Sequence, residues 1–132
     1  MKKIYVTCSL THATEQFRQD IAKLKAMLAG KYEVLHFLGL TDGTAQDVYR
    51  HDMECIKSCD LLLSDCSYPA IGLGFEIATA LGHHRPVLAV AHQTAKVSRM
   101  VFGIENTLFS FMRYQTLEEV ADAVDKKIQG II

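Results

Sequence analysis

The sequence predicts a three-layer α/β/α domain of flavodoxin or Rossmann type, built on a five-stranded parallel sheet. Strand-length apolar segments alternate with helix-length amphipathic segments along the whole chain, and this alternation is typical of βαβ units. The third apolar segment, Leu61-Leu62-Leu63, has no polar residue within it, as expected of a strand covered on both faces. Units of this kind are almost always right-handed, which favours one doubly wound sheet.

The individual elements follow from periodicity and end signals. The expected strands are short apolar runs at residues 4–8, 32–37, 61–64, 86–91 and 108–112. The expected helices include residues 17–28, 45–59, 75–81, 97–102 and 120–128, where apolar side chains recur at helical spacing. Gly30 is expected at the C′ position of the first helix, and residues 39–44 form a turn-rich loop. Thr116 and Glu119 fit a capping box before the last helix.

Composition limits the class of protein. The chain of 132 residues is expected to be a single domain, residues 1–132, and 49% hydrophobic residues suffice for a core without metals or disulfides. A formal net charge of −1 predicts no nucleic-acid partner. No apolar run approaches about 20 residues, so we expect no membrane segment. The start of the chain indicates a first strand of a cytoplasmic protein rather than a signal peptide.

The four cysteines indicate structural thiols. They are Cys8, Cys55, Cys59 and Cys66. No second pair completes a zinc site, and free cysteines commonly pack as small hydrophobes. We therefore expect no metal and no cofactor.

The segment between the third strand and the third helix is the leading candidate for chemistry. Gly72 and Gly74 precede Glu76, in what we interpret as a glycine-rich turn at the sheet edge where ligands of open α/β sheets bind. Glu76 would then be available to act on a ligand. The alternative is a glutamate in the first turn of a helix, stabilised by the helix dipole.

Asp52 and Asp65 are two further candidate site residues. Asp52 shares a helix face with Val48 and Ile56, and a carboxylate on a core-facing stripe must be paired or hydrogen-bonded. It is either functional or bonded to a backbone amide near the edge of the stripe. Asp65 ends the third strand, where it either joins the site or caps the next turn through an Asx-type bond.

The loop after the first strand is rich in hydroxyl groups. Thr7, Ser9, Thr11 and Thr14 lie at or beyond the strand end, where hydroxyls and backbone amides can hold a phosphate or sugar. Thr11 or Thr14 could equally cap the following helix. No lysine or arginine follows this strand before Arg18.

Read together, these segments resemble the 2′-deoxynucleoside 5′-phosphate N-hydrolases of the nucleoside 2-deoxyribosyltransferase superfamily. The resemblance is strongest in Arg50-His51-Asp52, in Cys59-Asp60-Leu61-Leu62-Leu63 and in Pro69-Ala70-Ile71-Gly72-Leu73-Gly74-Phe75-Glu76. It matches the Pro-x-x-Gly-x-Gly-Tyr-Glu segment of the family, with Phe75 in place of tyrosine. It continues weakly through residues 98–103.

The resemblance implies an enzyme that hydrolyses the N-glycosidic bond of a small-molecule deoxynucleoside or deoxynucleotide. Glu76 would be the nucleophile or oxocarbenium stabiliser, Asp52 the acid and Tyr5 a neighbour of the catalytic carboxylate. Ser9 would contact a 5′-phosphate, as would Ser98 from the partner subunit of a homodimer. The remaining substrate-binding positions would be Thr7, Leu10, Thr11, Pro69, Ala70, Gly72 and Gly74.

Three alternatives stay open. The first loop, Cys8-Ser9-Leu10-Thr11-His12, lacks the glycine and the phosphate-facing arginine of the family, and Ala70 replaces a serine, so the substrate could be unphosphorylated. A deoxyribosyltransferase would share the nucleophile but usually has an Asp-x-Gly-Thr-like approach to it. A non-catalytic nucleotide or flavin binder is the third, because residues 9–14 faintly resemble a flavodoxin phosphate loop.

Overall fold

A five-stranded parallel sheet with helices on both faces forms the protein. The computed structural model describes residues 1–39 and 41–132, so Leu40 of the expected loop at residues 39–44 lies outside the described residues. The strands are β1 (Lys3–Cys8), β2 (Glu33–His36), β3 (Leu61–Asp65), β4 (Val87–His92) and β5 (Phe109–Tyr114). Their order in the sheet is β2-β1-β3-β4-β5, and every pairing is parallel. The fold class expected from the sequence is confirmed.

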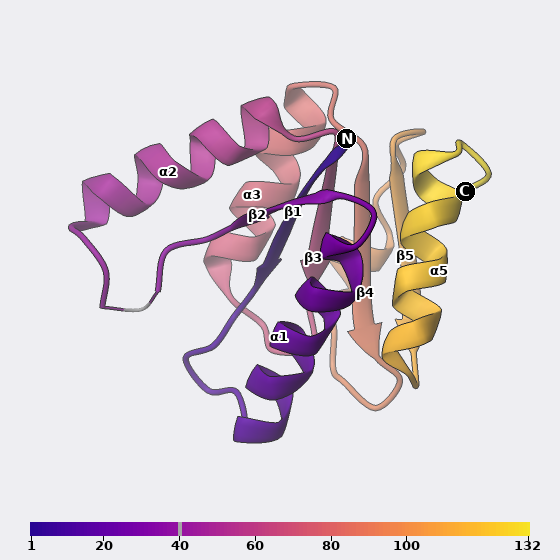
Figure 1. Ribbon diagram of the computed structural model, residues 1–132, viewed down its shortest axis with the longest axis horizontal. Coiled ribbons are helices and arrows are strands. Elements are labelled where there is room, and N and C mark those ends of the chain that lie inside the picture. Colours follow the sequence, from indigo (N-terminus) through magenta and orange to yellow (C-terminus); the bar gives the residue numbers. More distant parts are fainter. Residues whose placement is uncertain (40) are drawn as a thin grey trace.

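Among the described residues four helices connect the strands and a fifth follows β5, in the arrangement of Figure 1. They are α1 (Glu15–Ala29), α2 (Ala45–Ser58), α3 (Ile71–Gly82), α4 (Arg99–Phe102) and α5 (Leu117–Ile128). The capping box expected at Thr116 and Glu119 is present at the start of α5. Gly30 ends α1 as expected, but it is the C-cap with φ −70° rather than the C′ residue.

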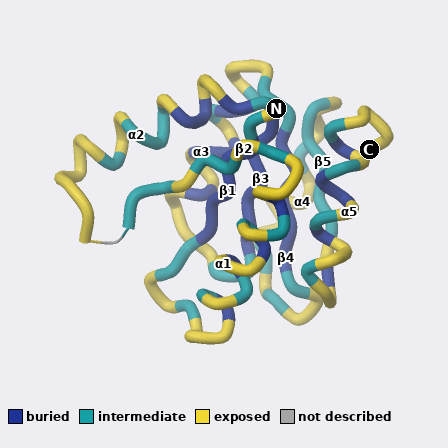
Figure 2. The backbone as a smooth tube through the Cα atoms, viewed as in Figure 1, coloured by how far each residue is buried: buried dark blue, intermediate teal, exposed yellow. Residues whose placement is uncertain are grey.

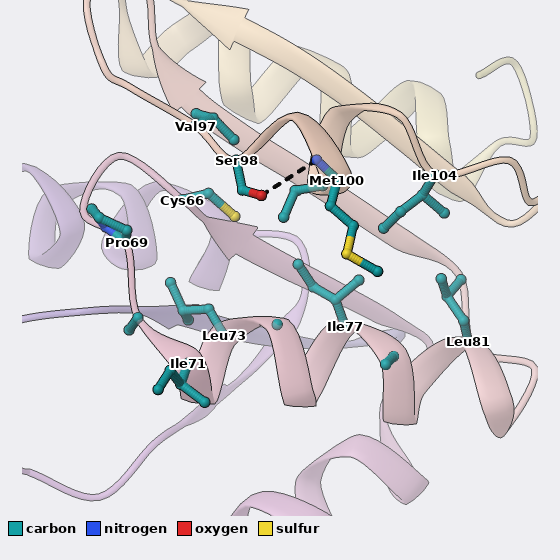
Figure 3. A pocket seen from close by; sticks show the side chains of 14 residues that line it. Cys66, Pro69, Ile71, Leu73, Ile77, Leu81, Val97, Ser98, Met100 and Ile104 are labelled. Atoms are coloured by element: carbon teal, nitrogen blue, oxygen red, sulfur yellow. Dashed lines mark hydrogen bonds between the residues drawn. The ribbon is translucent and has the colours of Figure 1, made fainter.

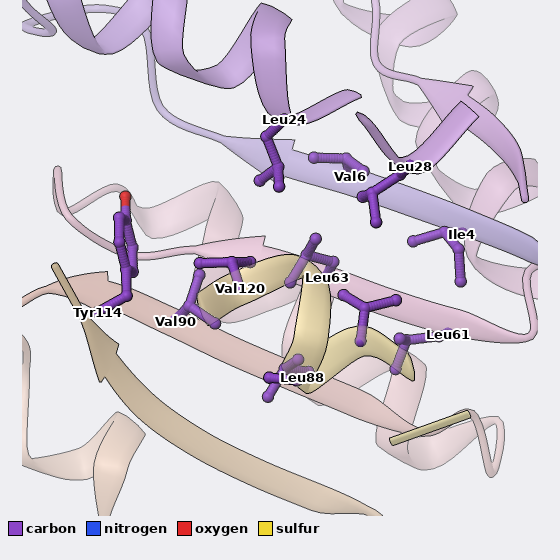
Figure 4. Packing of buried hydrophobic residues seen from close by; sticks show 12 residues of the cluster. Ile4, Val6, Leu24, Leu28, Leu61, Leu63, Leu88, Val90, Tyr114 and Val120 are labelled. Atoms are coloured by element: carbon purple, nitrogen blue, oxygen red, sulfur yellow. The ribbon is translucent and has the colours of Figure 1, made fainter. Parts of the chain in front are cut away.

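Alternate residues of each strand serve two separate cores. Leu61 and Leu63 join α1 and α5 in one cluster, whereas Leu62 joins α2 and α3 in the other. The first cluster fills the space between the sheet and α5, which Figure 4 shows through Val120, Leu63 and Leu88. The sheet is therefore covered on both faces, which explains why β3 has no polar residue before Ser64.

Helix α2 is anchored at one end only. Its C-terminal residues Cys55 and Ile56 are buried, whereas residues 45–47 are exposed, and Figure 2 shows this half extending from the body of the molecule. Asp52 lies between the exposed and the buried halves. The helix thus carries a carboxylate to the margin of the core above β1.

In the described residues, no helix is long and apolar enough to cross a membrane.

Candidate functional site

Tyr5, Asp52 and Glu76 come together between β1, α2 and α3. The Tyr5 hydroxyl donates a hydrogen bond to Asp52 Oδ1 at 2.8 Å, although the two residues are 47 positions apart. Tyr5 is fully buried, Asp52 is half-buried and Glu76 is 7% exposed. Asp52 is therefore held by a phenol rather than by a backbone amide, which was the alternative considered from the sequence.

The environment of Glu76 favours its protonated form. Burial raises the pKa of Glu76, the negative charge of Asp52 raises it further, and the nearby Tyr5 hydroxyl partly offsets the rise, which brings the value to about 8. Burial together with the two carboxylates also raises the pKa of Tyr5, which stays a neutral donor. Two carboxylates joined by one phenol therefore retain a proton near neutral pH.

The approach to Glu76 is helical rather than a glycine-rich turn. Helix α3 begins at Ile71, so Gly72 and Gly74 lie in its first turn and Glu76 in its second. Both earlier interpretations, a turn before Glu76 and a glutamate in the first helical turn, are wrong in this respect. A Cβ atom added at either glycine would have no neighbour within 4 Å, so the glycines leave open space beside the helix. Periodicity does not reveal this start, because the two glycines disfavour a helix and interrupt the apolar pattern of its first turn.

The loop after β1 is held by α1. Thr14 caps α1 by accepting a hydrogen bond from the Phe17 amide at 3.1 Å, so capping explains Thr14 and leaves Ser9 and Thr11 in the loop. The Arg18 guanidinium donates to the Leu10 carbonyl oxygen at 2.6 Å. A cation thus reaches the loop from α1, a contact that the position of Arg18 in the sequence does not predict.

An apolar pocket of about 830 Å³ lies on the other flank of α3, against α4. Four predicted substrate-binding residues line it, namely Pro69, Ala70, Gly74 and Ser98. Figure 3 shows Ser98 and Met100 facing Leu73 and Ile77 across this space. Glu76, Asp52 and Tyr5 are not among its lining residues. Within one chain the structure therefore does not bring Ser98 together with the carboxylate pair.

Asp65 has a different role from the carboxylate pair. One of its oxygens accepts a hydrogen bond from the Ser67 amide at 2.9 Å, the Asx-type bond considered above. The other accepts from the Tyr114 hydroxyl at 2.5 Å. Asp65 therefore links the ends of β3 and β5 across β4, and the sequence contains no signal for this contact.

All four cysteines are unpaired and buried. Among residues 1–39 and 41–132 no group of three or more His, Cys, Asp or Glu side chains is arranged to hold a metal. Burial raises the pKa of each thiol, so neutral thiols packed in the core are what the described part of the chain shows.

Sequence relatives agree with the resemblance. No protein-family model matches the chain. A protein of Thermofilum pendens, named provisionally as 2′-deoxynucleoside 5′-phosphate N-hydrolase 1, is 32% identical over 91 residues, covering 67% of this chain and 64% of the relative. A protein of Syntrophotalea carbinolica with the same name is 40% identical over 75 residues, covering 55% and 51%. The chain thus spans between half and just under two-thirds of the length of these relatives.

Solved structures agree on the fold. The CMP N-glycosidase of Clostridium botulinum superposes with a TM-score of 0.70 at 19% identity, covering 94% of this chain and 98% of that one. A 2-deoxyribosyltransferase of Leishmania mexicana superposes with a TM-score of 0.67 at 14% identity, over the full length of both chains. The chain is therefore a homologue of the 2′-deoxynucleoside 5′-phosphate N-hydrolases, on the fold shared with nucleoside 2-deoxyribosyltransferases.

Proposed function

We propose that the protein is an N-glycosidase that hydrolyses the bond between the base and the deoxyribose of a 2′-deoxynucleoside or its 5′-monophosphate. The observation that carries this proposal is the Glu76–Tyr5–Asp52 arrangement, in which one phenol lies between two carboxylates of different burial. Cleavage passes through an oxocarbenium-like state. One carboxylate can stabilise its positive charge while the other gives a proton to the leaving base. The names of the sequence relatives support the substrate class.

Each carboxylate has a role in the proposed reaction. Ionised Glu76 attacks C1′ or stabilises its positive charge, while Asp52 gives a proton to the departing base. The C1′–N bond breaks as its electron pair moves to the base. Water then gives one proton to Asp52 and takes the place of Glu76 on C1′, which restores both carboxylates. At neutral pH the pair already holds one proton, as the raised pKa of Glu76 indicates. The proposed reaction requires this proton to lie on Asp52, so that Glu76 is ionised when the substrate reacts.

The 5′ group is recognised, in this proposal, by the loop after β1, with Ser9, Leu10 and Thr11 as contacts. The Arg18 guanidinium at the Leu10 carbonyl supplies a positive charge to this loop, where the first loop itself contains no arginine. Such a charge favours a phosphate, so we expect 5′-monophosphates to be better substrates than the free nucleosides.

A homodimer completes the site. Ile71 and Met100 are 95% and 85% exposed, and both line the 830 Å³ pocket. Monomeric proteins rarely leave such an apolar surface uncovered. Because Ser98 lies on the pocket side of α3, away from Glu76, a second copy on this face is the arrangement that lets Ser98 contact the substrate of the partner's site.

A cytoplasmic location accords with the four unpaired cysteines.

The proposal predicts loss of base release when either carboxylate is changed. Glu76→Ala and Asp52→Asn should each reduce the release of free base from a panel of deoxynucleosides and their 5′-monophosphates by 10³-fold or more, on the order seen when catalytic groups are removed. Circular dichroism should show that both variants are folded. Asp60→Asn is the matched control, because Asp60 accepts a hydrogen bond from the Lys3 amide at the opposite end of the sheet.

The same assay separates hydrolysis from base exchange. Incubation with a second free base should leave deoxyribose or its 5-phosphate as the main sugar product. Efficient formation of the exchanged nucleoside would replace the hydrolase with a deoxyribosyltransferase, which shares this fold. Full activity in Glu76→Ala would contradict both.

A further inference from the structure

The hydroxyl of Thr7 is buried without a hydrogen-bond partner. Thr7 is 2% exposed, and its Oγ1 has no partner among the described residues. An unpaired buried hydroxyl destabilises a fold, whereas valine would fill the same space without that cost. A threonine at this position therefore needs an explanation other than packing.

Thr7 lies on the same face of the sheet as the carboxylate pair. Side chains alternate along β1, so Thr7 and Tyr5 both point toward α2 and α3, while Val6 points toward α1. Thr7 is paired in register with Ser64 of β3, the strand that leads into α3. The Ser64 hydroxyl contacts Cys66 Sγ at 3.8 Å and makes no hydrogen bond with the Thr7 hydroxyl.

The depths of Thr7 and Glu76 in the molecule are similar. Helix α3 follows β3, so it starts at the carboxyl edge of the sheet and runs back along it. Glu76 is the sixth residue of α3, which places it about 7.5 Å from the helix start at 1.5 Å per residue. Roughly two residues of a strand cover that distance, and Thr7 is one residue from the end of β1.

Ionised Glu76 is short of hydrogen-bond donors. The groups on this face that influence its charge are neutral or acidic: Tyr5 of β1, Asp52 and Cys55 of α2, and Cys66 after β3. The single proton of the Tyr5 hydroxyl is donated to Asp52. A carboxylate that must become ionised in a buried site needs another donor.

We propose that Thr7 is a positioning residue for Glu76, whose carboxylate accepts a hydrogen bond from the Thr7 hydroxyl when it is ionised for reaction. This inference rests on the proposed function of Glu76. It assigns the hydroxyl a role whenever Glu76 is ionised, with or without substrate, rather than a role in packing.

Thr7→Val and Thr7→Ser test the proposal. Thr7→Val should leave the melting temperature unchanged or raise it, because it removes an unpaired buried hydroxyl. It should move the acidic limb of the pH profile of kcat/KM to higher pH, and lower kcat/KM at pH 7 about threefold to tenfold, the effect of losing one hydrogen bond to an ionised group. Thr7→Ser keeps the hydroxyl and should restore the position of the limb.

The control and the contrary outcomes are defined by the same measurements. Thr94→Val, at an exposed threonine that bonds the His92 ring, should leave the profile in place. An unchanged limb in Thr7→Val would overturn the proposal, and so would misfolding or a marked fall in its melting temperature. Carbon-13 NMR of the Glu76 carboxyl in the free protein should also show a higher pKa in Thr7→Val. This readout remains decisive if no substrate is hydrolysed, and so separates this inference from the proposed function.

Discussion

At the scale of single residues, Glu76 has opposite consequences for stability and for reactivity. Its side chain is buried beside another carboxylate, which is an unfavourable place for a negative charge. The same features keep the group poorly solvated and therefore reactive once it is ionised. The residue thus lowers the stability of the fold at the pH where the proposed reaction requires its ionised form.

This cost should be visible in the pH dependence of stability. The pKa of Glu76 is about 8 in the folded chain against an ordinary 4.5, so between these values the folded state binds more protons than the unfolded state. The free energy of unfolding contributed by Glu76 therefore falls as the pH rises from 4.5 to 8. We expect Glu76→Gln to be more stable than the wild type by up to roughly 4–5 kcal/mol at pH 9, with little difference at pH 4.

Urea unfolding of both proteins at the two pH values measures this difference. Glu33→Gln, at an exposed glutamate of β2, provides the control and should show no comparable trend. Equal stability of Glu76→Gln and the wild type at pH 9 would show that Glu76 ionises freely and would remove the basis for its raised pKa.

At the scale of elements, α3 is built around its open first turn. Its N-cap, Ala70, makes no side-chain capping bond, and glycines occupy two of its first four positions. Leu73, Ile77 and Ala80 bury the helix against the sheet, so packing rather than intrinsic propensity holds this segment helical. The open turn leaves the space beside Glu76 clear.

Gly72→Ala should separate stability from activity in this helix. Gly72 lies one turn before Glu76 on the same flank, and an alanine Cβ would meet no atom within 4 Å. We expect the fold to gain about 0.5–1 kcal/mol, because alanine favours a helix over glycine, while base release falls because the methyl group enters the substrate space. Gly82→Ala, at the far end of α3, should give a similar gain in unfolding experiments without loss of activity. Unimpaired activity in Gly72→Ala would show that the substrate does not approach along this turn.

In the whole molecule, the two flanks of α3 carry different parts of the proposed site. The flank toward α2 carries the carboxylate pair, and the flank toward α4 carries the apolar pocket with Ser98. One chain therefore presents Ser98, one of the predicted phosphate contacts, away from its own Glu76. A second copy resolves this separation if the apolar flank is the interface.

Ile71→Asp should abolish the proposed dimer. A carboxylate at the centre of an apolar interface must be desolvated without a partner, so sedimentation equilibrium should show a monomer for Ile71→Asp and a dimer for the wild type. Ile132→Asp, at an exposed isoleucine of the C-terminus, should remain dimeric. A monomeric wild type would contradict the assembly.

Mixing of variants tests whether sites are shared between subunits. Glu76→Gln and Ser98→Ala homodimers each lack one group at both sites, whereas a heterodimer of the two has one site with both defects and one intact site. Recovery of activity after subunit exchange would support shared sites. Additive, unrecovered activity would place Ser98 in the site of its own subunit.

The amino-acid sequence predicts the order of strands and helices along the chain, the two-sided burial of the sheet and the two candidate catalytic carboxylates. These features depend on local periodicity and end signals, such as the Leu61-Leu62-Leu63 run and the Thr116 capping box. Three relations appear only in the folded chain: Tyr5 bonds Asp52, Thr7 has no hydrogen-bond partner among the described residues, and Ser98 lies across α3 from Glu76. The physical reason is that these relations are set by packing between segments about 20 to 50 residues apart, which leaves no trace in the spacing of residues along the chain.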